Sequence, residues 1–452
     1  MSTHLNSLPA CATTRLLRTT LHDRVAGVLI GSALGDAIGL YTEFLPAAHA
    51  AEAYPSRSFT LHPCPTPFKL DMHRAPKEPG HWTDDTDHAL LLLLSFLHTA
   101  GTTTEDGRAP PLPTQHDFAA RLRVWVTQGF RPLDTMPLGL GRLVASVVAT
   151  QGFESEPERV AREYWERTGR RVAPNGSLMR THPLGLMCLW REESEAFAVA
   201  AAISRVTHVD PRCVLACVIG TGMVRAVVRG ELQSEGDVDG LIERAVEWYF
   251  SEGVLEGQEL DLKELWRHVK PDGGLEDLRL DEHAAIGYVY KTLGSGVVLL
   301  RMAIRETTMN QGDLFHRAGL FEELIMDLVM RGGDADTNAC FAGAVLGGYL
   351  GYSILPDHWK KGLRDEKWLL GKVDALGEIL GLKDGSYDGK EDKDTELHGG
   401  KPALSQEEME VRWMLLQQAT SKKMEDAAKP VSSKGPGWSW SLPWQPRGKG
   451  KR

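Results

Sequence analysis

Cysteine is scarce in this chain, and the few cysteines present form no recognisable framework. There are six among 452 residues, with no Cys-x-x-Cys pair and no Cys/His spacing typical of a zinc site. This excludes a small secreted scaffold stapled by disulfides. Cys213 and Cys217 stand about one helical turn apart, and we interpret them as a reduced, buried pair rather than a metal site or a disulfide. A reducing compartment follows, so we predict a cytoplasmic protein, with nucleus and mitochondrion as open alternatives.

Long apolar runs, alternating strand patterns and an excess of positive charge are also missing. The stretch 25–40 is the nearest to a membrane span, but it is too short and contains Asp36. The formal net charge is -10, which argues against general coating of nucleic acid. We therefore predict no membrane span and no specific nucleic-acid partner.

The chain does contain abundant helical periodicity. Apolar residues recur three and four positions apart, which predicts an all-α fold. The stretches expected to be helical are 22–38, 86–98, 115–126, 157–166, 192–206, 212–229, 238–250, 282–305, 320–330 and 336–352.

Composition divides the chain into three parts. We expect a flexible N-terminus over 1–21, one helical domain over 22–382, and a largely disordered tail over 383–452 with a candidate helix at 405–419. The tail ends in a basic stretch that contains Trp438, Trp440 and Trp444. This Trp-rich stretch is a candidate for binding a partner. The alternative is a tail that packs loosely on its own domain or stays free.

Two of the expected helices carry glycine at every fourth position. The first has Gly27, Gly31, Gly35 and Gly39, and the last has Gly343, Gly347 and Gly351. Glycine inside a helix costs about 0.5–1 kcal/mol relative to alanine, so these ridges need a compensating contact. A glycine ridge lets another helix backbone approach closely. We predict that these two helices lie at the centre of the domain, against each other.

Two short acidic segments each open into an apolar helix. Residues 81–87 read His-Trp-Thr-Asp-Asp-Thr-Asp, and residues 331–338 read Arg-Gly-Gly-Asp-Ala-Asp-Thr-Asn. Helix capping explains one or two of these acids, but not two matching clusters. Carboxylates and hydroxyls are the oxygen ligands of magnesium, manganese or calcium, and two ions would fit this many ligands. We expect the paired glycines 332–333 to let the backbone approach a ligand.

Four weaker signals lie elsewhere. Glu43 follows the first glycine-rich helix and, taken alone, reads as a surface residue. Residues 174–180 read Pro-Asn-Gly-Ser-Leu-Met-Arg, a turn that either enters a helix or binds an anion. His208 stands between two expected helices, where it either ends one of them or lines a pocket. Asp36 interrupts an apolar helix, and a structural hydrogen bond is its expected role.

Taken in order, these segments resemble the ADP-ribosylglycohydrolase family, which includes the dinitrogenase-reductase-activating glycohydrolase. The matching motifs are Gly-Asp at 35–36 with Gly39, Trp-Thr-Asp-Asp-Thr at 82–86, Asn-Gly-Ser-Leu-Met-Arg at 175–180, Thr-His at 207–208 and Gly-Gly-Asp-Ala-Asp-Thr at 332–337. They span residues 25–355. The resemblance implies a compact orthogonal multi-helix domain of this family's type, with a binuclear metal cleft.

The resemblance also implies roles for particular residues. The implied metal ligands are Thr83, Asp84, Asp85, Asp334, Asp336 and Thr337, holding two Mg²⁺ with Mn²⁺ as the alternative. The implied catalytic residues are Glu43, Asp84, Asp85 and Asp336, of which Glu43 or an aspartate moves the proton. The implied substrate contacts are Asn175, Gly176, Ser177, Met179 and His208.

The implied activity is magnesium-dependent hydrolysis of the glycosidic bond between ADP-ribose and a modified arginine or serine side chain of a protein. Two alternatives stay open. One is hydrolysis of a small ADP-ribose derivative, and the other is a non-catalytic relative that binds ADP-ribose.

Overall fold

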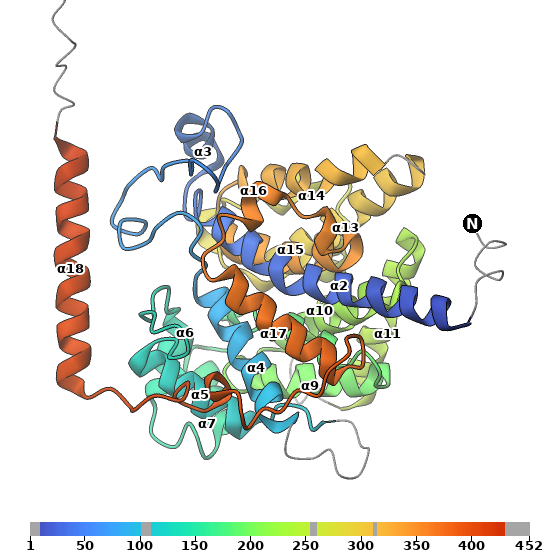
Figure 1. The fold of residues 1–452 in the computed structure, drawn as a ribbon, viewed down its shortest axis with the longest axis horizontal. Helices are drawn as coiled ribbons and strands as arrows, with labels where there is room; N and C mark the ends of the chain where they lie inside the picture. The colour runs from blue at the N-terminus through green and yellow to red at the C-terminus, as the bar shows by residue number, and fades with distance from the viewer. Residues whose placement is uncertain (1–9, 101–109, 254–259, 311–313, 430–452) are drawn as a thin grey trace, which may run out of the picture.

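The computed structural model describes residues 10–100, 110–253, 260–310 and 314–429. Within these ranges the chain is built of helices, and the only β-pairing consists of isolated bridges. Figure 1 shows the helices crossing at steep angles around a shared core. The predicted all-α class is confirmed.

The glycine-rich helices α2 (Ala10–Gly39) and α15 (Ala335–Leu350) form the centre of this core (Figure 1). Their ridges face each other in antiparallel register. Gly27 lies against the Gly347 carbonyl, and Gly31 lies against the Gly343 carbonyl. A Cβ at Gly31 would come within 2.5 Å of that oxygen. Only glycine permits this approach, so the predicted contact is confirmed.

The remaining helices surround this pair. α13 and α14 flank α15, α10 lies beneath both central helices, and α17 runs beside α2 (Figure 1). Their bounds are α3 (Ala47–Ala53), α4 (Asp84–Ala100), α5 (Gln115–Gln128), α6 (Arg142–Ala149), α7 (Pro157–Arg167), α8 (His182–Met187), α9 (Glu193–Arg205), α10 (Pro211–Arg229), α11 (Glu235–Ser251), α12 (Leu262–Val269), α13 (Val289–Met309), α14 (Leu314–Val329), α16 (Asp357–Lys360), α17 (Glu366–Ile379) and α18 (Gln406–Ala428).

One helix among the described residues, α10, is long and apolar enough to cross a membrane by length and composition. In this structure 94% of its apolar window is buried inside the protein, where it packs against α8, α9 and α11. That burial is the behaviour of a core helix.

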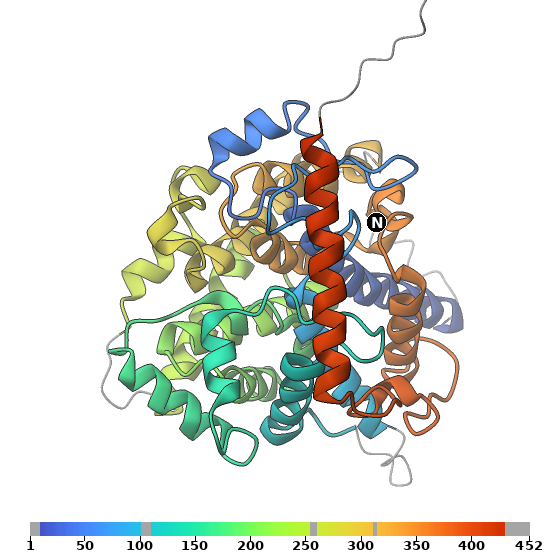
Figure 2. The same ribbon diagram turned by 90° about the vertical axis from the view of Figure 1, so that its left-hand side faces the viewer.

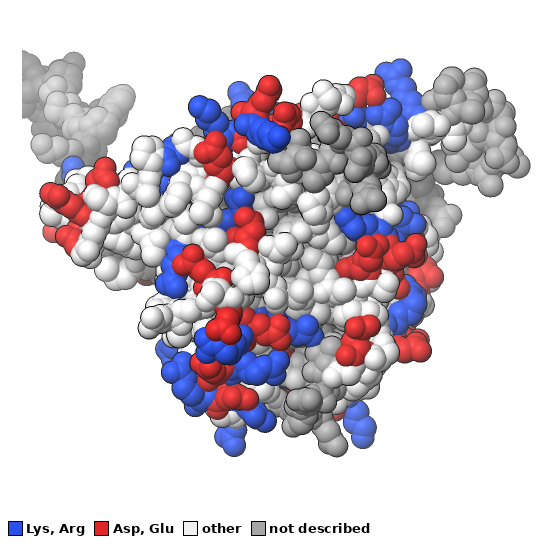
Figure 3. Space-filling model, turned by 90° about the horizontal axis from the view of Figure 1, so that it is seen from below, with Lys and Arg blue, Asp and Glu red and all other residues white. Residues whose placement is uncertain are grey.

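The surface seen in Figure 3 carries acidic and basic side chains interspersed with uncharged ones. No single-sign field dominates that face.

The expected boundaries at both ends of the domain are wrong. Helix α2 begins at Ala10, inside the segment expected to be flexible. At the other end, residues 383–405 pack on the domain instead of being disordered. The buried ammonium of Lys372 binds Asp392 and Asp394 there, and Thr395 contacts His98. Polar composition misled the prediction because these acids are neutralised by a partner elsewhere in the chain.

The candidate helix at 405–419 is confirmed but is longer, since α18 continues to Ala428. It begins with a capping box in which Ser405 and Glu408 satisfy each other's backbone N–H groups. In Figures 1 and 2 this helix stands on the outside of the bundle and runs along one face. The Trp-rich stretch, a candidate for binding a partner, lies outside the described residues.

We predict that Gly347→Val prevents stable folding, because its side chain would overlap the Gly27 backbone. Overpacking of this kind typically costs about 1–3 kcal/mol, and backbone cannot yield as a side chain can. The measurement is the free energy of unfolding in urea. Gly371→Ala in α17 is the control, because nothing lies within 4 Å of the added Cβ. A Gly347→Val protein as stable as wild type would contradict the account.

Candidate active site

Three helix ends meet at one point because the glycine contact sets the register. Gly39, at the end of α2, lies against the backbone of Ala335 and Asp336 at the start of α15. The first turn of α4 joins them because its backbone N–H groups donate to Asp36 of α2. Each helix contributes acidic side chains at this junction.

Asp36 caps α4 from another helix. Its carboxylate accepts hydrogen bonds from the backbone N–H of Thr83 at 2.9 Å, the N–H of Thr86 at 3.1 Å and the Thr86 hydroxyl at 2.6 Å. The first N–H groups of a helix have no partner within the helix, so this capping is favourable. The predicted structural role of Asp36 is confirmed, and it fixes α4 against α2.

The carboxylates form two overlapping groups. Asp36, Asp85 and Asp336 each present an oxygen within 4.8 Å of the others, and so do Glu43, Asp334 and Asp336. Asp336 is common to both groups. The two acidic segments, far apart in sequence, therefore converge as the sequence predicted. Asp36 is an additional member of the cluster that its expected structural role did not reveal.

Hydroxyl groups complete the cluster. Thr83 donates to Asp85 Oδ2 at 2.9 Å, and the buried Thr337 belongs to the same junction, where its backbone N–H donates to Asp336 Oδ1 at 2.9 Å. Asp84 lies at the rim, where its carboxylate packs on Gly139, a residue with φ of 93°. A side chain at Gly139 would displace Asp84.

Burial and mutual repulsion make these carboxylates hard to ionise in the absence of a cation. Burial is the main cause that raises the pKa of Asp84, Asp85 and Asp336 well above the usual value, and neighbouring carboxylates raise it further. Burial likewise raises the pKa of Asp334 to about 6. The buried ammonium of Lys77 opposes this effect at Asp84.

The donor set fits a hard divalent cation. The carboxylates and hydroxyls of the cluster all offer oxygen. Among the described residues, Asp85 Oδ1 is buried without a hydrogen-bond partner. An orphaned carboxylate oxygen inside a like-charged cluster is costly unless a cation meets it. These side chains can therefore hold a metal.

Glu43 is only 5% exposed, so the expectation that Glu43 taken alone lies at the surface is wrong. Its carboxylate is hydrogen-bonded to His73. Burial raises the pKa of Glu43, but the hydrogen bond and charge of His73, with help from Lys77, outweigh it and lower the pKa overall. Glu43 is thus the readily ionised carboxylate among neighbours that resist ionisation.

Arg74 holds the segment that carries Glu43, a role that no sequence pattern predicted. Its buried guanidinium donates to the carbonyls of Leu40 at 2.9 Å and Tyr41 at 3.1 Å, and also to the Glu43 carbonyl. These carbonyls follow the end of α2, where no helical partner remains. Only the folded chain brings Arg74 to them.

The turn that carries Asn175 touches the acidic cluster directly. Asn175 Nδ2 donates to Asp334 Oδ2 and to Thr292 Oγ1, both at 2.9 Å. Thr292 in turn donates to Asn338 at 2.7 Å. Asn175 therefore orients Asp334, and Thr292 belongs to this network without having been predicted.

The other predicted substrate contacts are buried beside that turn. Ser177 accepts hydrogen bonds from Ser204 and Cys217, so its hydroxyl faces the core. Met179 is buried at 4% exposure, and the His208 ring lies next to the Gly176 backbone. His208 is held by Thr207, whose hydroxyl also accepts from Arg180. Contact of these residues with substrate stays a prediction.

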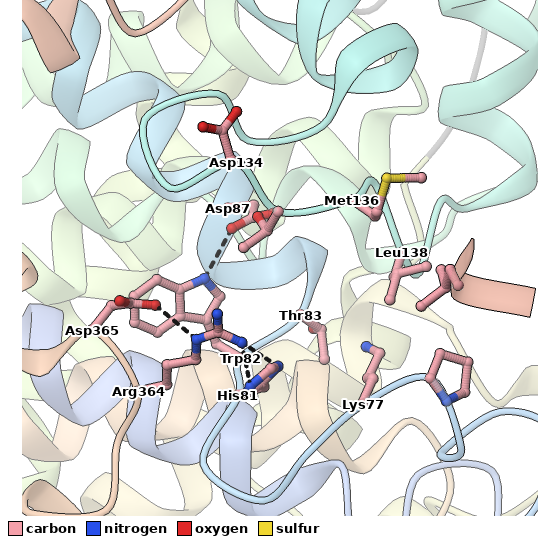
Figure 4. A pocket seen from close by; sticks show the side chains of 13 residues that line it. Lys77, His81, Trp82, Thr83, Asp87, Asp134, Met136, Leu138, Arg364 and Asp365 are labelled. Atoms are coloured by element: carbon pink, nitrogen blue, oxygen red, sulfur yellow. Dashed lines mark hydrogen bonds and ion pairs between the residues drawn. The ribbon is translucent and has the colours of Figure 1, made fainter. Parts of the chain in front are cut away.

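A cavity opens beside the cluster (Figure 4). Lys77, Trp82 and Thr83 line one side, and Met136 and Leu138 line another. Trp82 is fixed by donating from its indole to Asp87 at 2.9 Å. The further lining residues are Pro76, His81, Asp87, Asp134, Thr135, Arg364, Asp365 and Leu416.

A family model, ADP-ribosylglycohydrolase, matches residues 17–387. The chain belongs to the ADP-ribosylglycohydrolase family. Membership supports hydrolase activity on ADP-ribosylated substrates.

Individual members of the ADP-ribosylglycohydrolase family are only distantly similar. ADP-ribosylarginine hydrolase Tri1 of Serratia proteamaculans is 25% identical, over 75% of this chain and 74% of that protein. ADP-ribosyl-[dinitrogen reductase] glycohydrolase of Rhodospirillum rubrum is 24% identical, over 80% of this chain and 98% of that protein. A solved structure described as an ADP-ribosylglycohydrolase-related protein complex is 21% identical with a TM-score of 0.49, covering 80% of this chain and 99% of that one.

The paired glycines of the family motif let the backbone pass close to other parts of the chain. Gly332 and Gly333 have φ of 66° and 73°, and they pack against the carbonyls of Leu45 and Leu280. Gly333 also exchanges backbone hydrogen bonds with Phe44 and Leu45. This contact fixes the segment that follows Glu43, and approach of the glycines to a ligand stays a prediction.

We predict that the metal-free protein loses stability as pH rises from 5 to 8. The folded pKa values of Asp334, about 6, and Asp87, about 7, lie above the unfolded value of 3.8. Above that unfolded value the unfolded chain releases protons that the folded chain retains, so stability falls as the pH rises and levels off once the pH exceeds the folded pKa. Thermal unfolding in EDTA across this range measures the effect.

Added Mg²⁺ should flatten that pH dependence by stabilising the ionised carboxylates. Asp336→Asn should abolish the rise in Tm that Mg²⁺ produces in wild type. Glu247→Gln, an exposed change on α11, is the control. A magnesium-induced rise in Tm that persists in Asp336→Asn would contradict the assigned cation site.

Proposed function

We propose that this protein is a magnesium-dependent hydrolase of the glycosidic bond between ADP-ribose and a modified protein side chain. The observation that carries the proposal is the pair of carboxylate groups sharing Asp336, with Glu43 as a member of one of them. Membership of the family supports ADP-ribosylated compounds as the substrates. The carboxylate cluster supplies the groups that would bind the cation and move the proton.

Asp36, Asp85 and Asp336 would hold one ion, with the hydroxyls of Thr83 and Thr337 alongside; Glu43, Asp334 and Asp336 would hold a second. Asp84, at the rim, is placed to join them. A bound divalent ion supplies positive charge that orients ribose hydroxyls and favours an ionised water. Mn²⁺ is the alternative ion, since it accepts the same oxygen donors.

Glu43 is the residue best suited to move a proton. It is ionised more readily than its neighbours and is hydrogen-bonded to His73, which can carry the proton onward. Cleavage at the anomeric carbon passes through an oxocarbenium-like state, which a nearby carboxylate stabilises. Arg74 keeps Glu43 in place by fixing its backbone.

Substrate binding would use the turn at 175–177, with Met179 and His208. His208 is neutral because burial keeps its pKa well below the usual value, so it can donate a hydrogen bond without adding charge. Lys77, which lines the cavity, is placed to offset the charge of a diphosphate.

Arginine-linked ADP-ribose is the preferred substrate in this proposal. The named relative from Serratia proteamaculans is an ADP-ribosylarginine hydrolase, and the chain spans 74% of it. Serine-linked ADP-ribose and small ADP-ribose derivatives are the alternatives. A non-catalytic binding role is disfavoured because the acidic groups and Glu43 are all present and converge. The cytoplasmic location predicted from the cysteines stays a prediction.

We predict that wild type releases free ADP-ribose from arginine-linked peptide in the presence of Mg²⁺, and that EDTA stops the reaction. Glu43→Gln should lower kcat by about 10²–10⁴-fold, the usual contribution of a general acid or base. Asp336→Ala should abolish turnover, because it removes the carboxylate common to both groups.

A serine-linked peptide and a small ADP-ribose derivative, tested in parallel, decide the linkage. Glu247→Gln is again the control and should retain wild-type rates. Undiminished turnover by Asp336→Ala, or release that is indifferent to EDTA, would refute the proposal.

A further inference from the structure

Helix α18 lies beyond the part of the chain that the family model matches, which ends at residue 387. It runs along the face of the bundle shown in Figure 2, over the loops that border the cavity. We propose that α18 is a strap that hinders access of large folded proteins to the active site more than access of ADP-ribose on small or flexible carriers. This inference rests on the proposed function.

α18 contributes directly to the cavity wall. Leu416, near the middle of the helix, lines the same cavity as Thr83, one of the residues assigned to the cation. Met136 and Leu138 also line it (Figure 4). Leu416 thus forms part of the wall of the cavity that reaches Thr83.

The first end of the strap is tied to the loop on one side of the cavity. Lys401 binds Asp134 at 2.6 Å, and Arg412 lies 3.7 Å from the same carboxylate. Arg131 donates to the Pro402 carbonyl at 2.9 Å. Asp134 itself lines the cavity.

The far end is tied to the opposite side. Lys423 donates to the Lys77 carbonyl at 2.7 Å and to Glu78 at 2.9 Å. Lys77 is the buried cation of the cavity wall. The helix therefore bridges the two walls, from the Asp134 loop to the Lys77 loop.

The strap is held weakly enough to release. Met409 and Thr420 are its only buried residues among those described, and Leu415 and Met414 are about half exposed. A helix packed so little is not secured by apolar burial. Its ties combine ion pairs, which contribute little and are screened by salt, with hydrogen bonds to the carbonyls of Pro402 and Lys77. Docking is therefore an equilibrium that the Lys423–Glu78 contact biases.

Size selection follows from this position. A folded protein must press its surface against the rim to present a modified side chain, and α18 occupies that rim. A small amine or a flexible peptide needs only the space beside Leu416. The strap therefore affects the two classes of substrate unequally.

The test compares a small arginine-linked ADP-ribose derivative with an ADP-ribosylated folded protein, using the full chain with Mg²⁺. Lys423→Glu places two acids together and should raise kcat/KM for the protein substrate by about fivefold, the scale of one ion pair in a docking equilibrium. The small substrate should change less than about twofold. Glu78→Lys added to Lys423→Glu should restore the wild-type ratio.

Lys422→Glu is the matched control, since that neighbour is exposed on the same helix. Leu416→Ala should favour the protein substrate, and Leu415→Ala, at 56% exposure, should not. If Lys423→Glu changed kcat/KM equally for the two substrates, or changed neither, the strap proposal would be overturned.

Hydrogen exchange provides a readout that does not depend on turnover. Amides of residues 77–83 and of α18 should exchange faster in Lys423→Glu than in Lys422→Glu. If wild type hydrolyses neither substrate, the proposed function is refuted, and faster exchange confined to Lys423→Glu still supports a docked cover. Identical exchange in the two variants would also overturn the proposal that α18 is docked over the cavity through Lys423.

Discussion

The backbone contact between α2 and α15 is the constraint on which the rest of the structure depends. Because glycine lines both surfaces, the two helices approach until their backbones touch, in a single antiparallel register. That register brings the end of one helix to the start of the other. A slip of one turn would separate Asp36 from Asp336 and remove the shared carboxylate cluster. The entropic cost of glycine in these helices is thus linked to the geometry of the site.

The acidic cluster is built from groups that also have structural duties. Asp36 caps α4, Asn175 orients Asp334, and the carbonyls that follow α2 are held by Arg74. These contacts fix the positions of carboxylates that would otherwise repel one another. Burial and repulsion raise the pKa of Asp85 and Asp336. Ionising these carboxylates therefore costs free energy in the folded chain, and a bound cation offsets that cost.

Much of this arrangement was predictable because the decisive features are local in sequence. Spacing alone predicted the longer core helices, the glycine contact and the two acidic segments that converge, but it missed α6, α12 and α17. Arg74, Thr292 and the packing of residues 383–405 were not predictable, since each acts through a partner distant in the chain. The burial of Glu43 and the self-contact of Gly332 and Gly333 likewise depend on how loops meet. The order of motifs identified the family, but it gave no indication of α18 over the cavity.

The most direct test of the account is anomalous diffraction from crystals grown with Mn²⁺. The account predicts a manganese peak bounded by the carboxylates of Asp85 and Asp336, in contact with the Asp85 oxygen that otherwise has no partner. Crystals saturated with Mn²⁺ that show no peak there, with the carboxylates in the same positions, would contradict it.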